Sequence, residues 1–456
     1  MEWQKKNILI IGMARSGISS AKLCSRLGAN VKLQDMKTRE ELIANMAEEI
    51  NLLEGMGIQL ILGEDPEPII DTQDLIILSP GVPTDLGFIQ KAKRMNIPVW
   101  SEIELGYVLC SCPIVAITGT NGKTTTTTLV GEIMKAYNPN THVVGNIGTP
   151  FTERVEQIKQ TDIVVAEISS FQLETIHTFK PKVSAILNIT PDHLNRHKTY
   201  ENYISAKERI FENQDSSDFC ILDEDDEICR KMKEKVRAQI VPFSRKKELD
   251  KGVFVKGDEI YVKWNEINAG ICKTSDLQIL GDHNVENALA ATAITICMGV
   301  PAEVVKKILI SFKGVEHRIE YVDTVEGVQY YNDSKATNVD AAIIGIKAMK
   351  RPIVLIGGGM DKGADFTEWV NMFPDRVKHL VLIGETTDQI IQTAHEKGFF
   401  NISKASSLNE AVTLAKNIAV SGDCVLLSPA CASWDMFKSY EERGDLFKQA
   451  VYALKG

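Results

Sequence analysis

The fold class of this chain is decided by one stretch, Pro113-Ile-Val-Ala-Ile-Thr-Gly-Thr-Asn-Gly-Lys-Thr124. It predicts a buried strand, a glycine-containing loop and a helix that begins at the Lys-Thr pair. Gly119 and Gly122 allow backbone N–H groups to converge on phosphate oxygens, and the helix N-terminus adds positive potential. Lys123 can then reach the β and γ phosphates, and the Thr124 hydroxyl can ligate magnesium. Ile117 stands where the usual first glycine would be, so the stretch predicts a short variant of the phosphate loop.

Short apolar runs recur on both sides of this stretch and are separated by amphipathic segments of helix length. That alternation is typical of strands buried on both faces of parallel sheets, so the predicted fold class is α/β. Several runs end in Gly, Ser or Thr, where a parallel sheet opens onto its ligand crevice. The predicted strands are Ile8 to Ile11, Leu75 to Leu78, Ile114 to Ile117, Ile163 to Ala166, Ala185 to Leu187, Ile353 to Ile356, Leu380 to Ile383 and Val425 to Leu427.

The length and the grouping of these runs predict three domains. The chain has 456 residues, and one domain typically accounts for about 150. We expect the domains at residues 1–100, 101–313 and 314–456. A hairpin around Gly257-Asp258 is predicted inside the middle block, at the edge or the side of its sheet, and another around Glu326-Gly327 is predicted to begin the last block.

The composition excludes several classes of protein. Hydrophobic residues make up 44% and charged residues 25%, which argues against disorder, collagen-like repeats and a disulfide scaffold. The formal net charge of -10 disfavours a general nucleic-acid or anionic-membrane surface. No apolar run approaches the roughly 20 residues that span a bilayer, and no signal-peptide pattern opens the chain, so a cytoplasmic protein is expected. Cys110 and Cys112 lack the CxxC spacing of redox and zinc sites, so we expect reduced thiols.

A second glycine turn follows the first predicted strand and begins a helix: Ile10-Ile-Gly-Met-Ala-Arg-Ser-Gly17. The turn indicates a dinucleotide or sugar-nucleotide site, although Ala14 replaces the middle glycine and so breaks the GxGxxG fingerprint. Asp35 lies near the position of an acidic ribose partner, which keeps nicotinamide binding open. A diphosphate of any kind could occupy the same helix N-terminus. The rigid turn Ser79-Pro-Gly-Val-Pro83 ends a further strand.

Carboxylates and histidines stand at the ends of two central strands. Glu167 closes a buried run, and a buried carboxylate needs a partner, which magnesium on nucleotide phosphates would supply. Asp192 and His193 follow the strand at Ala185 to Leu187. His193 and His197 have the spacing of a zinc pair, but no third ligand of the right type stands nearby in the sequence. Lys207, taken alone, is expected to be an exposed helix lysine.

Three polar loops follow predicted strands in the last block: Tyr331 to Asn338, Gly357 to Phe366 and Leu427 to Phe437. Taken singly, their Asn, Asp, Ser and Gly residues are ordinary turn chemistry. Three such loops at strand ends of one domain are better explained as one crevice that the loops line.

Together these motifs resemble the Mur ligases of peptidoglycan precursor synthesis. The resemblance runs in order through the whole chain and rests on Gly119 to Thr124, Glu167 to Ser170, Asp192-His193, Gly281 to Asn287, His317-Arg318 and Asp333 to Asn338. Two longer segments, Glu167 to Glu174 and Ser428 to Phe437, resemble the family member that adds D-glutamate. The resemblance implies a Rossmann-like N-terminal domain for the UDP end of the substrate, a central P-loop-type ATPase domain and a Rossmann-like C-terminal domain. The central domain should combine a parallel sheet with a small antiparallel sheet.

The resemblance also assigns residues to sites, and it implies catalysis by Lys123, Glu167, His193 and Lys207. The implied ATP-binding residues are Gly119, Thr120, Asn121, Gly122, Lys123, Thr124, Thr125, Asn284, Asn287, Arg318 and Asp333. The UDP-sugar would contact Arg15, Ser16, Ser79, Gly81, Asn146 and His193. D-Glutamate would contact Lys335, Thr337, Lys362, Ser433 and Tyr440. Two magnesium ions would be held by Thr124, Glu167, His193 and Lys207, the last as a carbamate. The individual roles of Met36, Lys37 and Asp361 stay open.

The implied reaction is an ATP-dependent ligation. The carboxylate of an L-alanyl group attacks the γ-phosphate, and the amine of D-glutamate then displaces phosphate from the acyl phosphate. The expected partners are these small molecules, without nucleic acid or membrane insertion, and the chain is expected to be a monomer. The alternatives are a nicotinamide-dependent oxidoreductase, a folate-adding or cyanophycin-type ligase of the same superfamily, and a non-catalytic regulatory binding module.

Overall fold

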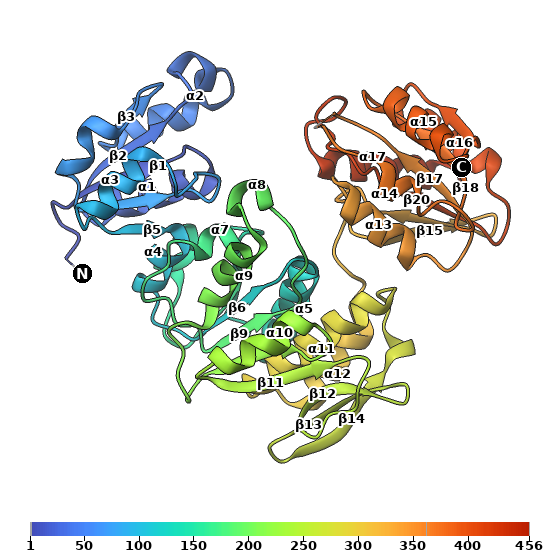
Figure 1. The fold of residues 1–456 in the computed structure, drawn as a ribbon, viewed down its shortest axis with the longest axis horizontal. Coiled ribbons are helices and arrows are strands. Elements are labelled where there is room, and N and C mark those ends of the chain that lie inside the picture. The colour runs from blue at the N-terminus through green and yellow to red at the C-terminus, as the bar shows by residue number, and fades with distance from the viewer. Residues whose placement is uncertain (1, 362, 456) are drawn as a thin grey trace. The chain divides into compact units, whose positions relative to one another are not determined.

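The computed structural model describes residues 2–361 and 363–455. The chain divides into two units, one of residues 1–274 with 286–309 and the other of residues 275–285 with 310–456. Two sheets lie in the first unit and one in the second (Figure 1). Among the described residues, none of the helices combines the length and the apolarity needed to cross a membrane.

The N-terminal sheet is entirely parallel, with strand order β3-β2-β1-β4-β5. The order reverses between β1 and β4, which is where an open α/β sheet forms its ligand crevice. The predicted strands at Ile8 to Ile11 and Leu75 to Leu78 are confirmed. The elements are β1 (Asn7–Ile11), α1 (Arg15–Arg26), β2 (Asn30–Asp35), α2 (Arg39–Gly55), β3 (Gln59–Leu62), η1 (Glu67–Thr72), β4 (Leu75–Leu78), α3 (Gly87–Arg94) and β5 (Val99–Ser101).

The central sheet has nine strands in the order β14-β13-β12-β11-β10-β9-β6-β8-β7. Its strands from β6 to β11 are parallel, and the three that follow are joined by antiparallel pairing. The strands are β6 (Ile114–Thr118), β7 (Thr141–Gly145), β8 (Ile163–Glu167), β9 (Val183–Ile186), β10 (Phe219–Asp223), β11 (Gln239–Ser244), β12 (Gly252–Lys256), β13 (Glu259–Trp264) and β14 (Ile267–Lys273).

The antiparallel part continues the central sheet at its edge. The hairpin predicted around Gly257-Asp258 is present as β12 and β13. β12 also pairs with β11 in parallel through Phe243 with Val253 and Ser244 with Phe254. These few backbone bonds attach the small antiparallel sheet to the parallel one, so the two expected sheets form one.

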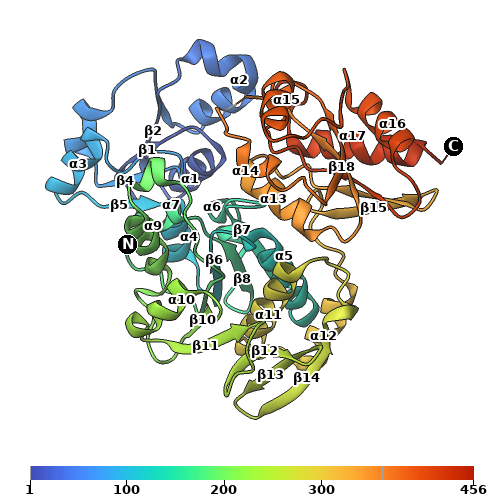
Figure 2. The ribbon, with the colours of Figure 1, turned by 45° about the vertical axis from the view of Figure 1, so that its right-hand side comes forward.

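Helices cover the central sheet, and α5 runs beside β6 and β8 in both views of the ribbon (Figure 1, Figure 2). The helices are α4 (Glu102–Leu109), α5 (Lys123–Tyr137), α6 (Phe151–Arg154), η2 (Val155–Gln157), α7 (Ser170–Leu173), α8 (Leu194–His197), α9 (Tyr200–Glu208), η3 (Arg209–Phe211), α10 (Glu227–Met232), η4 (Lys233–Lys235), η5 (Thr274–Asp276), α11 (Asp282–Cys297) and α12 (Ala302–Ser311).

The N-terminal and central sheets share one hydrophobic core, which is why they fall in one unit. Ile8 and Ile10 of β1 belong to the same buried cluster as Ala116 of β6 and Val164 of β8. Helices α1, α4 and α6 make the connection: Ser19 Oγ lies 2.8 Å from Thr152 Oγ1 at the contact of α1 with α6.

The C-terminal sheet has the order β15-β16-β20-β17-β18-β19 and is parallel except for β15, which pairs antiparallel with β16. Glu326 and Gly327 join those two strands with φ of 52° and 81°, the left-handed pair of a tight hairpin turn, as predicted. The elements are β15 (Glu320–Val325), β16 (Val328–Asn332), α13 (Val339–Ala348), β17 (Ile353–Gly357), α14 (Thr367–Val370), β18 (Val377–Leu382), α15 (Thr387–Glu396), β19 (Ile402–Lys404), α16 (Leu408–Ile418), β20 (Cys424–Leu427) and α17 (Tyr440–Ala453).

Candidate active site

The phosphate loop between β6 and α5 is held in place by Asn188, in the loop that follows β9. Thr120 N donates to Asn188 O at 3.0 Å, and Asn121 N donates to Asn188 Oδ1 at 2.8 Å. Asn188 Nδ2 donates back to Asn121 O at 3.1 Å. The loop is therefore pre-organised by the protein itself before any phosphate arrives.

Gly122 cannot be replaced without moving the loop. Its φ is 82°, and an added Cβ would lie 2.2 Å from Asn287 Oδ1. That oxygen accepts a hydrogen bond from Thr126 Oγ1 at 3.1 Å, so Asn287 of α11 packs directly against the start of α5. Asn284 lies one turn earlier on the same helix and donates its Nδ2 to Leu280 O at 2.7 Å. Thr124 and Thr125, on the first turn of α5, are both buried.

Two lysines converge on one carbonyl of the loop. Lys123 Nζ and Lys207 Nζ each donate to Gly119 O at 2.8 Å. Lys207 also lies 3.3 Å from Thr118 Oγ1. Burial lowers the pKa of Lys207 well below its usual value, the charge of Lys123 lowers it further, and Asp192 and Glu167 oppose that shift.

The expectation that Lys207 is an exposed helix lysine is wrong, because its residue is only 1% exposed. α9 presents Tyr203, Ala206 and Lys207 inward over the end of β6, and Lys207 Nζ lies 4.8 Å from the centre of the Tyr203 ring. The sequence around Lys207 could not reveal this burial, because the side chain is covered by Thr118 and Gly119, at the end of β6 and in the loop after it, which are distant in sequence.

Glu167 ends β8 as a buried carboxylate with one oxygen engaged. Its Oε1 accepts from Asn146 Nδ2 at 2.8 Å. Its Oε2 is buried and has no hydrogen-bond partner within the described residues. A buried carboxylate oxygen without a donor is costly, and hard cations such as magnesium prefer such ligands. The donor set therefore fits a magnesium ion. The Asn146 side chain is bonded to Glu167, so its contact with the sugar substrate stays a prediction.

His193 and His197 differ in environment. His193 stands at φ 53° before α8, its side chain is 51% exposed, and its ring centre lies 4.9 Å from that of Phe171. Asp192 Oδ1 accepts from His193 N at 2.8 Å. His197 is buried, and its Nε2 lies 3.0 Å from Ser170 Oγ.

The described residues give no support to a zinc pair at α8. The one group of three metal-ligating side chains in mutual reach within residues 2–361 and 363–455 is Glu316, His317 and Asp445. Lys448 Nζ lies 3.1 Å from Asp445 Oδ1 and also pairs with Glu316, so a cation already neutralises that cluster.

The first glycine turn is built from backbone and short side chains. Gly12 has a φ of 97°, and an added Cβ on Gly17 would lie 1.9 Å from Gly12 O. Ser79 Oγ donates to Gly12 O at 2.9 Å. Asp35 accepts Met13 N at 2.7 Å and Lys37 N at 3.0 Å, so both of its oxygens hold backbone.

The helix that follows this turn is open at its N-terminus. No side chain caps α1 at Ala14. Arg15 and Gly81 are exposed, Ser16 is half-buried and Ser79 is buried. The turns after β1 and β4 thus meet at the switch point of the sheet, where a diphosphate would find free backbone N–H groups.

The three polar loops of the C-terminal sheet meet through Asp333 with Ser428 and through Met360 with Ala432, and a crevice lined by them stays a prediction. Asp333 Oδ2 accepts from Ser428 Oγ at 2.7 Å, and Lys335 Nζ lies 5.6 Å from the centre of the Tyr440 ring. Burial raises the pKa of Asp333 to about 7, against the opposing effects of Ser428 and Arg318. Ser433 is buried, Thr337 is half-buried, and Lys362 lies outside the described residues.

Arg443 is a site-building residue that the sequence reasoning missed. It is buried on α17, donates Nη2 to Ser334 O at 2.8 Å and to Cys431 O at 3.2 Å, and so ties two of the polar loops together. An arginine in an otherwise amphipathic helix carries no local signal of this role. The sequence likewise does not mark Asn188 as part of the site. Phe171 and Glu174 lie within the segment Glu167 to Glu174, but no individual role was predicted for either.

Comparison with known proteins gives consistent matches along the chain. Residues 6–101 match the "Mur ligase MurD-like, N-terminal domain", residues 117–295 the "Mur ligase middle domain" and residues 317–431 the "Mur ligase, glutamate ligase domain". The UDP-N-acetylmuramoylalanine--D-glutamate ligase of Alkaliphilus metalliredigens is 48% identical over 457 residues, covering 100% of both chains. The protein of that name from Lachnoclostridium phytofermentans is 48% identical over 455 residues, again covering 100% of both.

Solved structures share the fold at lower identity. The UDP-N-acetylmuramate-alanine ligase of Thermotoga maritima matches with a TM-score of 0.59 and 21% identity, covering 98% of this chain and 99% of that one. A pseudomurein peptide ligase type C from Methanothermus fervidus matches with a TM-score of 0.57 and 18% identity, covering 99% and 100%. At these identities the likeness shows a common fold.

Proposed function

This chain belongs to the Mur ligase family, and we propose that it adds D-glutamate to UDP-N-acetylmuramoyl-L-alanine with hydrolysis of ATP to ADP and phosphate. It is an ATP-dependent amide ligase of peptidoglycan precursor synthesis. The observation that carries the chemistry is the group at the phosphate loop: two lysine Nζ atoms on Gly119 O, and a buried Glu167 with an oxygen that no described donor satisfies.

The first step is phosphoryl transfer to the substrate carboxylate. A carboxylate oxygen forms a bond to the γ-phosphorus, the bond to the bridging oxygen breaks, and ADP leaves. Lys123 neutralises charge on the transferring group, and the N–H groups of the loop orient the phosphates. Magnesium, held by Thr124, Glu167, His193 and a modified Lys207, would neutralise further phosphate charge.

The second step forms the amide. The amine of D-glutamate attacks the acyl carbon, loses a proton, and phosphate leaves. We assign the amino acid to the predicted crevice of the C-terminal sheet. Lys335 lies beside Tyr440 at the start of α17, and Thr337 and Ser433 belong to the first and third of the polar loops. Lys335 supplies a cation for a carboxylate, which an acidic substrate requires. The assignment of Lys362 is kept from the family resemblance alone.

We assign Lys207 a carbamate in the active enzyme. Burial and the charge of Lys123 lower the pKa of its amine well below the usual value, which favours the neutral form, and a neutral amine adds carbon dioxide: the nitrogen bonds the carbon and one proton is released. The product keeps one N–H, which can still donate to Gly119 O. It also places an anion beside the Lys123 cation, and these opposite charges attract each other.

The UDP end of the substrate is assigned to the first glycine turn and to the turn after β4, with Arg15, Ser16, Ser79 and Gly81 as contacts. The ATP contacts of Asn284, Asn287, Arg318 and Asp333 are assigned in the same way. We also propose domain limits of 1–100, 101–313 and 314–456, a monomeric enzyme, and a cytoplasmic location, where ATP and nucleotide-linked precursors are available.

A phosphate-release assay tests the function. The enzyme is given ATP, magnesium and UDP-N-acetylmuramoyl-L-alanine with a panel of D- and L-amino acids. We expect phosphate release with D-glutamate and background rates with L-glutamate, D-aspartate and diamino acids. Preference for another amino acid would identify a different ligase of the superfamily. No ATP-dependent turnover with any member of the panel would contradict the proposed function.

A further inference from the structure

We propose that Glu174 is a positioning residue of this ligase: its carboxylate holds α8, and through α8 it orients both His193 and the turn that follows β4. Glu174 lies just after α7, and α8 follows His193. The inference rests on the proposed function, because His193 and Gly81 are assigned to the sugar substrate there.

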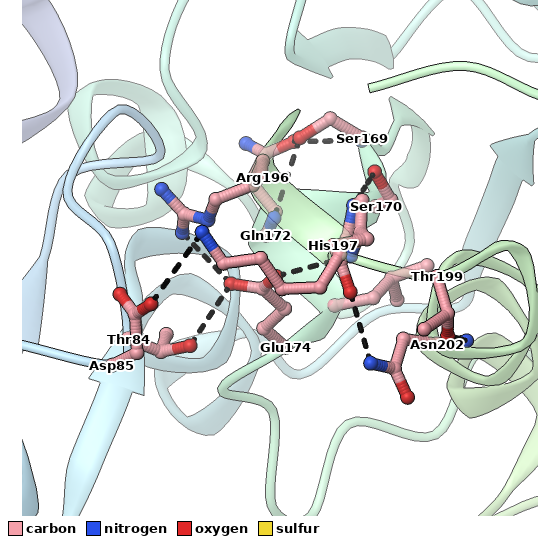
Figure 3. A network of polar contacts seen from close by, with 12 residues as sticks. Thr84, Asp85, Ser169, Ser170, Gln172, Glu174, Arg196, His197, Thr199 and Asn202 are labelled. Carbon is pink, nitrogen blue, oxygen red and sulfur yellow. Dashed lines mark hydrogen bonds and ion pairs between the residues drawn. The ribbon is translucent and has the colours of Figure 1, made fainter. Parts of the chain in front are cut away.

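One carboxylate engages two residues of α8 and one residue of the loop that follows β4 (Figure 3). Glu174 Oε2 accepts from Arg196 Nη2 at 2.8 Å and from Thr84 Oγ1 at 3.4 Å. Its Oε1 lies 3.3 Å from His197 Nδ1. The Glu174 side chain is 14% exposed, so these interactions are little screened by solvent.

Arg196 carries the connection to the N-terminal domain. Its Nη2 donates to Val82 O at 2.8 Å, and its Nη1 lies 3.4 Å from Gly81 O. The guanidinium therefore bridges Glu174 and the turn at Ser79 to Pro83, which is assigned to the UDP-sugar. A planar, always charged group suits this bridging role.

His197 carries the connection to His193. Because the Glu174 carboxylate can only accept, the His197 proton belongs on Nδ1, and Nε2 then accepts from Ser170 Oγ at 3.0 Å. The His197 ring stacks on Phe171 at 5.5 Å between centres and 23° between planes. Phe171 in turn contacts His193, at 4.9 Å between centres.

α8 needs such support because it cannot hold itself. It has four residues, which is far below the length of a stable isolated helix. It is also bounded by His193 and Lys198, with φ of 53° and 70°, a backbone region that is unfavourable for residues other than glycine. External contacts therefore decide its position.

The arrangement of Ser170, His197 and Glu174 also resembles a hydrolase triad. Ser170 is only 2% exposed, so no substrate carbonyl reaches its hydroxyl. The three residues therefore form a structural brace, and the exposed end of the chain of contacts is His193.

The test compares Glu174→Gln with Asp85→Asn. Asp85 lies at the same junction, but its Oδ2 is 3.9 Å from Lys198 Nζ and both side chains are 65% exposed, so it serves as the matched control. For Glu174→Gln we expect the KM for UDP-N-acetylmuramoyl-L-alanine to rise about tenfold and kcat to fall about tenfold, the effect of losing a charge-assisted hydrogen bond. The KM for ATP should stay within about twofold, and Asp85→Asn should match the wild type.

Glu174→Asp should recover part of the loss, since it keeps the charge at a shorter reach. If Glu174→Gln does not fold, Arg196→Lys keeps the charge but removes the fork to Val82 O, and the same split of KM values is expected. Unchanged kinetics in Glu174→Gln, or equal rises of the KM for both substrates, would overturn the proposal.

Calorimetric binding of UDP-N-acetylmuramoyl-L-alanine without ATP separates this inference from the proposed function. A wild-type protein that binds the UDP-sugar but does not turn over would end the proposed ligase activity. The comparison of Glu174→Gln with wild type would then still decide the positioning role, with weaker binding in the variant supporting it and equal binding contradicting it.

Discussion

The turns after β1 and β6 use the same backbone device and differ in what surrounds it. Each follows a parallel strand, contains glycine at positive φ, and begins a helix that no side chain caps. At the first turn, the side chains of Ser79 and Asp35 form hydrogen bonds with backbone atoms, among them Gly12 O and Met13 N of the turn itself. In the second, Lys123 and Lys207 share one carbonyl, close enough to Glu167 for its charge to affect Lys207.

The difference fits the proposed division, in which the first turn binds the UDP-sugar and the second takes part in catalysis. In the first turn, the side chains of Ser79 and Asp35 are paired with backbone groups of the protein. The uncapped start of α1 still offers backbone N–H groups to a ligand. The second turn packs two lysine amines against one carbonyl and leaves Glu167 Oε2 without a described partner, which folding alone would disfavour. Under the proposed function, the transferring phosphate and its cations would complete the charge balance at the second turn. The following predictions test this division.

The largest effect is expected for Lys123→Ala. Lys123 acts as a charge on the transferring phosphate, so kcat should fall by ~10² to 10³ while the fold is kept. Lys135→Ala, in the exposed last turn of the same helix, is the matched control and should retain full turnover. Rates come from phosphate release and folding from circular dichroism. Normal turnover of Lys123→Ala would contradict the proposal that the second turn, unlike the first, takes part in catalysis.

The next effect is expected for Lys207→Ala, which should lose roughly 10- to 100-fold in activity. Added formate or acetate should restore part of it by entering the vacated space with carboxylate oxygens. The same additives should not rescue Lys123→Ala. In the wild type, activity should fall in buffer stripped of carbon dioxide and return with bicarbonate. Full activity of the alanine variant would refute the carbamate.

Gly17→Ala should damage the first turn alone. The new Cβ would lie 1.9 Å from Gly12 O, so the turn must shift, and the free energy of unfolding should drop by about 1–3 kcal/mol. We expect UDP-sugar binding to weaken about tenfold in calorimetry, with the KM for ATP unchanged. Gly55→Ala is the control, because its added Cβ meets nothing within 4 Å. An equal loss of ATP affinity would show that the two turns are not independent.

The smallest effect distinguishes ligands of the first turn. UDP at about five times its Kd should stabilise the protein by about 1 kcal/mol, seen as a rise in Tm, and NAD at the same concentration should not. Both Asp35 oxygens already accept from backbone N–H groups, which makes this carboxylate a poorer acceptor for a nicotinamide cofactor's ribose. Equal shifts with NAD would revive the oxidoreductase alternative.

Much of the fold followed from local pattern. The apolar runs marked β1, β4, β6 and β17 to within a residue or two, and both predicted hairpins are present. The phosphate loop was equally plain, because its glycines, lysine and threonine lie together in the chain. The environments of Lys207, His197 and Arg443 could not be predicted in this way, because each side chain is surrounded by residues that are distant in sequence.

The sequence by itself determined the order of strand, turn and helix, the family of the chain, and the two turns able to accept phosphates. These depend on side-chain periodicity and on short motifs, which act over neighbouring residues. Only the tertiary structure decided that Lys207 is buried, that His193 is half-exposed while His197 is braced, and that the first two sheets share a core. The physical reason is that burial and pKa depend on which distant segments exclude water from a group, and a one-dimensional pattern does not carry that information.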